Sequence, residues 1–159
     1  MDHLFAMASV GVVSAILGSR TIWSIPALFV AAMCVGGILG LNGIVLPRAE
    51  LWIAVSLVAL GLMIASGGAV SPAGRKLPFW VAAVFVMTFG AAHGNAHGLE
   101  IPATAGPVAF TVGFLIGTTA LHLIGVSVGV AAIRHYWEAV AMRMAGVFTA
   151  ALGLGLLAR

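Results

Sequence analysis

Residues 79–102 read FWVAAVFVMTFGAAHGNAHGLEIP, an apolar run that closes on two histidines and a glutamate. A run of this length and polarity is typical of a helix that crosses a bilayer. Pro102 predicts its end, since proline disfavours helical backbone in the residue before it. The whole chain agrees: 62% of its 159 residues are hydrophobic and 7% are charged, whereas soluble domains carry about 25% charged residues. We therefore predict an integral membrane protein.

The remaining sequence divides into further apolar segments, at about 4–17, 23–41, 51–69, 107–133 and 139–157. Most are close to the roughly 20 residues that a spanning helix needs, and no ten-residue segments alternate as a β-barrel would require. Tryptophans lie at four segment starts, where interfacial anchors belong: Trp23, Trp52, Trp80 and Trp137. The prediction is an all-α integral membrane protein, a compact six-transmembrane-helix bundle with one domain over residues 1–159.

Glycine is the expected packing residue of this bundle. Many of the 21 glycines recur at four-residue spacing, namely Gly36 and Gly40, Gly90, Gly94 and Gly98, Gly113 and Gly117, and Gly125 and Gly129. Small residues at this spacing let membrane helices approach closely, so we expect glycine-rich helix contacts. The same stripes can join copies of the chain, which leaves a homo-oligomer open.

The loop charges predict the orientation. The loops after the first, third and fifth segments carry four positive residues, Arg20, Arg75, Lys76 and Arg134, against Arg48 and Arg159 on the other side. The positive-inside rule then places both termini outside the cytoplasm. The start of the first segment and the end of the fourth would share this outer surface.

The strongest chemical signal is His93, His97 and Glu100. On a helix these three positions share one face, and two imidazoles with a carboxylate suit a divalent first-row metal. The alternative is a pair of interfacial histidines bonded to lipid headgroups or carbonyls. Polar groups inside a membrane are costly and mark function by default, which favours the metal.

Two other groups are candidates to extend this site. Asp2 and His3 would meet the fourth segment at the outer surface, and Met7 lies one helical turn beyond His3. His122 lies deep in the fifth segment with Thr118 one turn before it, as a relay position on a transport path would. For His122 the alternative is an imidazole satisfied by Thr118 or by a backbone carbonyl.

Other chemistry has little support in the sequence. No nucleophile elbow, zinc-protease motif or phosphate-binding loop is present, so we do not expect an enzyme. The net charge of +3 is mostly loop charge, and no basic cluster suggests nucleic acid. The single cysteine, Cys34, excludes an intrachain disulfide.

The motifs resemble those of the HupE/UreJ family of small bacterial membrane proteins. Residues 92–100, AHGNAHGLE, are similar to the family's Phe-His-Gly-x-(Ala/Val)-His-Gly-x-Glu motif, with Ala92 in place of phenylalanine, and Asp2-His3 is similar to the end of its His-x5-Asp-His motif. The resemblance implies a nickel permease of the bacterial inner (cytoplasmic) membrane that supplies hydrogenase or urease maturation. Ni2+ would be the transported ion, with Co2+ or Zn2+ as alternatives and no organic cofactor.

The first histidine of the His-x5-Asp-His motif would fall before Met1. Either residues precede this sequence, or the site has one ligand fewer than the family pattern. Two other functions stay open: a non-transporting metal-binding accessory or sensor protein, and a membrane metalloenzyme that activates water.

Overall fold

The computed structural model describes residues 2–68, 77–101 and 106–158, with side chains from His3 onward. These residues form six helices: α1 (Asp2–Leu17), α2 (Thr21–Leu41), α3 (Ala49–Ala65), α4 (Phe79–Leu99), α5 (Pro107–Ala132) and α6 (Tyr136–Leu157). They follow the six predicted segments in order. The third helix ends earlier than predicted, at Ala65, and the sixth begins earlier, at Tyr136.

Helix length separates these elements into two groups. The helices α2, α4, α5 and α6 are long and apolar enough to cross a membrane, whereas α1 and α3 are apolar but shorter, with 16 and 17 residues. A helix satisfies its own backbone hydrogen bonds, which is what a lipid environment demands. All four tryptophans lie near helix starts and are exposed, as the anchor prediction requires.

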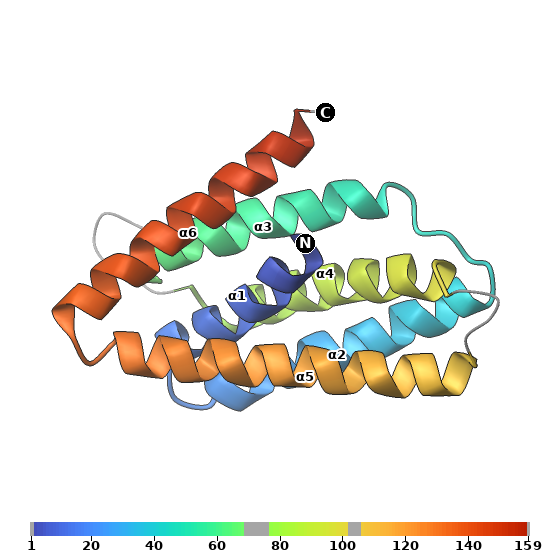
Figure 1. Cartoon of the computed structure of the whole chain (residues 1–159), viewed down its shortest axis with the longest axis horizontal. Coiled ribbons are helices and arrows are strands. Elements are labelled where there is room, and N and C mark those ends of the chain that lie inside the picture. The colour runs from blue at the N-terminus through green and yellow to red at the C-terminus, as the bar shows by residue number, and fades with distance from the viewer. Residues whose placement is uncertain (1, 69–76, 102–105, 159) are drawn as a thin grey trace.

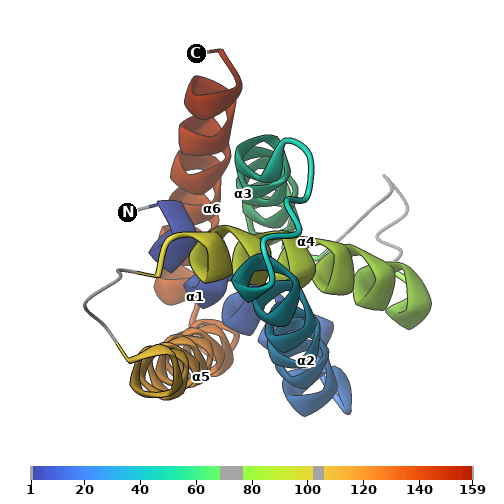
Figure 2. The ribbon, with the colours of Figure 1, turned by 90° about the vertical axis from the view of Figure 1, so that its right-hand side faces the viewer.

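The helices pack most closely in three pairs (Figure 1): α1 with α5, α2 with α4, and α3 with α6. In the first two pairs the helices run parallel, and in the third they run antiparallel. Seen from one end, α4 crosses the bundle between α3 on one side and α2 and α5 on the other (Figure 2). This helix carries the histidine motif, so the motif lies within the bundle.

Glycines lie in the contact of each pair. A Cβ added to Gly94 or Gly36 of the α2–α4 pair would overlap a backbone carbonyl, that of Met33 or Ala91. Gly125 meets the carbonyl of Ala8 in the same way in the α1–α5 pair, and in the α3–α6 pair a Cβ on Gly146 would lie 2.8 Å from the carbonyl oxygen of Gly61. Only backbones without side chains between them can approach this closely.

One predicted stripe makes no such contact. Gly113 and Gly117 have no described heavy atom within 4 Å of an added Cβ. Both are exposed on the outer side of α5. Among the described residues this pair therefore brings no two helices together, because α5 turns its other face to α1.

Candidate metal centre

Three histidines from α1 and α4, far apart in the sequence, meet inside the bundle. The ring of His3, on α1, lies 5.1 Å from that of His93 and 4.7 Å from that of His97, between centroids. His93 and His97 occupy successive turns of α4. The Nε2 atoms of all three rings are buried. We call these residues the histidine cluster.

The orientation of His93 is fixed by its own helix. Its Nδ1 lies 2.9 Å from the carbonyl oxygen of Phe89, one turn earlier. A carbonyl only accepts hydrogen bonds, so Nδ1 carries the proton and Nε2 carries the lone pair. His93 is fully buried, and its lone pair is directed away from its own backbone. This is the tautomer that a metal-binding imidazole needs.

His97 connects the histidine cluster to the surface. Its Nδ1 lies 4.0 Å from Oε2 of Glu100, whose side chain is 62% exposed against 21% for His97. On its other side the His97 ring lies 4.2 Å from that of Phe114 on α5. Burial therefore increases from Glu100 through His97 to His93, as in a site entered from one end of the bundle.

A cavity of about 240 Å³ opens beside His97 between α2, α4 and α5. Its walls are mainly apolar and include Met33, Cys34 and Phe114. Cys34 thus shares a cavity with His97, one of the predicted ligands.

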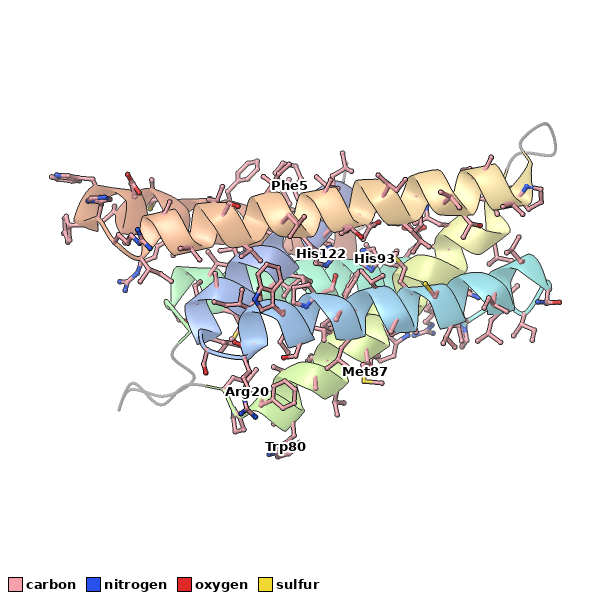
Figure 3. The ribbon with its side chains drawn as sticks, turned by 90° about the horizontal axis from the view of Figure 1, so that it is seen from below. Phe5, Arg20, Trp80, Met87, His93 and His122 are labelled. Atoms are coloured by element: carbon pink, nitrogen blue, oxygen red, sulfur yellow. The ribbon has the colours of Figure 1, made fainter. Side chains whose placement is uncertain are left out.

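Phe29 of α2 links the histidine cluster to the predicted transport path. Its ring lies 5.5 Å from that of His93 and 5.1 Å from that of His122. Figure 3 shows His93 and His122 inside the bundle, between α2 and α5, while Met87 and Trp80 point away from it. The two predicted groups are therefore neighbours across a single aromatic ring.

His122 is buried and bonded to its own helix. Its Nδ1 donates to the backbone carbonyl of Thr118 at 2.7 Å, which is one of the two alternatives that the sequence left open. The Thr118 hydroxyl is instead directed at sulfur, 3.4 Å from Sδ of Met7. Met7 therefore belongs with this deeper group rather than with His3.

The predicted ligands are only partly assembled. Within residues 3–68, 77–101 and 106–158, no three His, Cys, Asp or Glu side chains are already arranged to hold a metal ion. The ring of His3 packs against those of His93 and His97, and Glu100 lies 4.0 Å from His97. The side chain of Asp2 lies outside the described part. An ion would bind here only after a change of side-chain rotamers.

Four residues of this region were not predicted. Phe29 and Phe114 contact the imidazoles, and Met33 lies beside Thr118; apolar residues in apolar segments give no signal of such a role. Asn95 did carry a signal, since a buried amide in a membrane helix needs partners. It is fully buried and binds the α2–α3 loop.

Comparisons with known proteins agree with these motifs. The family profile described as HupE / UreJ protein matches residues 1–156. The chain is also similar to Protein HupE from Rhizobium leguminosarum bv. viciae, with 37% identity over 158 residues that cover 99% of this chain and 78% of the relative. No solved structure matches the chain.

Proposed function

Because the chain belongs to the HupE/UreJ family, we propose that it carries Ni2+, or a similar first-row dication, into the cytoplasm. The family consists in general of nickel or cobalt transport accessory proteins for hydrogenase and urease, and it is not catalytic. Co2+ and Zn2+ are the alternative ions, since first-row affinities for imidazole overlap.

The observation that carries the proposal is the approach of His3 to His93 and His97, at ring separations of 5.1 and 4.7 Å. Ninety residues separate His3 from His93, so no local propensity accounts for their meeting. Three imidazoles suit a borderline dication better than a hard one such as Mg2+. With Asp2 and Glu100 they form the proposed outer site.

The proposed path continues past Phe29 to His122, Thr118 and Met7. These residues are buried, and His122, on α5, offers the next imidazole after the histidine cluster. An inside-negative potential of 100 mV would favour entry of a dication by about 4–5 kcal/mol. This driving force needs no nucleotide site.

We further propose that all six helices lie in the cytoplasmic membrane as one bundle. The 17 residues of α3 extend about 25 Å, slightly less than the hydrocarbon thickness of about 30 Å. The positive-inside rule supports a periplasmic position for the C-terminal end of α4, which carries Glu100.

The test is Ni2+ uptake by purified protein in liposomes that hold a nickel-sensitive dye and a potassium diffusion potential. His93→Ala and His97→Ala are each expected to abolish uptake, because each removes an imidazole from the histidine cluster. The matched control is His135→Ala, since His135 is exposed in the turn between α5 and α6 and should leave uptake unchanged.

Full uptake by both cluster variants would contradict the proposal. Ni2+ binding by the wild type without any uptake would instead indicate a non-transporting accessory or sensor protein. Elution as a single species and unchanged helical circular dichroism show that each variant is folded.

A further inference from the structure

Two methionines converge on the hydroxyl of Thr118, and His122 binds the backbone carbonyl of the same residue. The Thr118 Oγ1 lies 3.4 Å from Sδ of Met7, on α1, and 3.8 Å from Sδ of Met33, on α2. The hydroxyl has one proton and can donate it to only one of the two sulfurs. Each of these side chains is at most 2% exposed. Two thioether sulfurs from different helices thus lie within reach of a single buried point.

His122 adds a nitrogen donor to this group. Its Nδ1–H is held by the Thr118 carbonyl, so Nε2 carries the lone pair. Nε2 is buried and makes no hydrogen bond to any residue that the structure describes. Buried polar atoms in native proteins almost always have a partner, and an exception calls for an explanation. A nitrogen that is available to bind a cation, on the residue one turn after Thr118, provides one.

We propose that Met7, Met33 and His122 form a second cation site, specific for borderline and soft cations, one step inside the histidine cluster. The proposal rests on the proposed transport function and adds the residues and the selectivity of its inner step. Imidazole accepts Ni, Cu, Zn and Fe, whereas thioethers favour soft ions, and Mg2+ and Mn2+ prefer oxygen. The site offers one hydroxyl oxygen, from Thr118, and no carboxylate among the described side chains that surround it.

This arrangement explains how a transporter can separate two tasks. The outer site, with its imidazoles and carboxylates, can attract many dications. An inner site of thioethers and imidazole replaces the water ligands of a hard cation poorly. Mg2+ and Mn2+ are therefore not passed on from the outer site. Phe29, in contact with both His93 and His122, lies between the two sites.

The first experiment asks whether sulfur binds the ion. The variant His93→Ala/His97→Ala removes most of the outer site, and X-ray absorption at the nickel edge is measured after loading with one equivalent of Ni2+. Sulfur scattering is expected, and it should disappear when Met7→Leu and Met33→Leu are added. Leucine keeps the volume of methionine, so packing is preserved. The matched control is Met87→Leu, an exposed methionine on the outside of α4, which should leave the sulfur signal intact.

A spectrum with only nitrogen and oxygen neighbours would overturn the inner site, as would a folded double-alanine variant that binds no Ni2+. The same measurement on the wild type, loaded with two equivalents, gives an answer even if the double-alanine variant does not fold. In that sample too, sulfur scattering is expected, and its absence would overturn the site.

The second experiment measures selectivity in the liposome assay. Met7→Leu/Met33→Leu is expected to lower the preference for Ni2+ over Mn2+ by about tenfold. Substitutions around a metal site typically lower metal affinity by about this factor or more. An unchanged preference, with normal Ni2+ uptake, would overturn the inner site and leave the transport function standing. Sulfur scattering from bound Ni2+ in a wild type that shows no uptake would support the inner site and overturn the transport function.

Discussion

At the scale of single residues, Asn95 shows how the histidine motif is held in place. Its Oδ1 accepts a hydrogen bond from the backbone N–H of Leu46 at 2.8 Å, and its Nδ2 donates to the carbonyl oxygen of Ile44 at 2.8 Å. Nδ2 also lies 3.4 Å from the carbonyl oxygen of Gly36. One side chain between His93 and His97 thus ties α4 to α2 and to the loop that follows it.

Asn95→Ala is expected to lower the free energy of unfolding by about 1–3 kcal/mol, because it removes two hydrogen bonds that hold the α2–α3 loop against α4, each worth about 0.5–1.5 kcal/mol. Thermal unfolding in detergent, followed by circular dichroism, measures the loss. The matched control is Asn42→Ala. Asn42, the residue after α2, is exposed and its side chain donates to the nearby Ile38 carbonyl, so the expected change is smaller. Equal losses in the two variants would contradict the bridging role of Asn95.

At the scale of helices, the glycine contacts set how closely α2 and α4 approach. A Cβ on Gly94 would overlap the Met33 carbonyl, which belongs to helical backbone and cannot move aside as a flexible side chain would. The two helices would have to separate along the stretch that holds His93 and Phe29. These glycine contacts therefore stabilise the α2–α4 pair and also fix the distances within the site.

Gly94→Ala is expected to destabilise the protein by about 1–3 kcal/mol, the usual cost of overpacking, and to reduce Ni2+ uptake. Gly117→Ala makes the same change on a helix face with no described atom within 4 Å. It should leave uptake unchanged and stabilise the helix by up to about 1 kcal/mol. Thermal unfolding and the liposome assay are compared for both. A tolerated alanine at Gly94 would refute the close contact.

The sequence predicted the positions of the helices along the chain better than which face of each helix packs against a neighbour. The apolar runs and prolines indicated six helices, and four-residue spacing brought His93 and His97 onto one face. The spacing of Gly113 and Gly117 is identical to that of Gly90 and Gly94, yet only the second pair meets another helix. These helices are apolar on every side, so no polar face indicates which side is outward. Contacts such as Phe29 with His122 depend on the pairing of helices, which local patterns do not encode.

At the scale of the whole molecule, consecutive helices alternate in direction. The turns after α1 and α5 lie at one end of the bundle, and the loop between α2 and α3 lies at the other (Figure 1). Arg20 and Arg134 belong to the first end, and Arg48 belongs to the second. The charge rule therefore predicts that the loop between α2 and α3 lies in the periplasm and the turn between α5 and α6 in the cytoplasm.

This orientation is tested with single cysteines in a Cys34→Ser background, which removes the one native thiol. Val45 is 64% exposed in the α2–α3 loop, and His135 is exposed in the α5–α6 turn. A membrane-impermeant maleimide, applied to spheroplasts that lack the outer membrane barrier, is expected to label Val45→Cys and not His135→Cys. After lysis both should react, which shows that each thiol is accessible. The reverse pattern in intact spheroplasts would place Glu100 and the histidine cluster toward the cytoplasm, and the proposed path would then lead out of the cell.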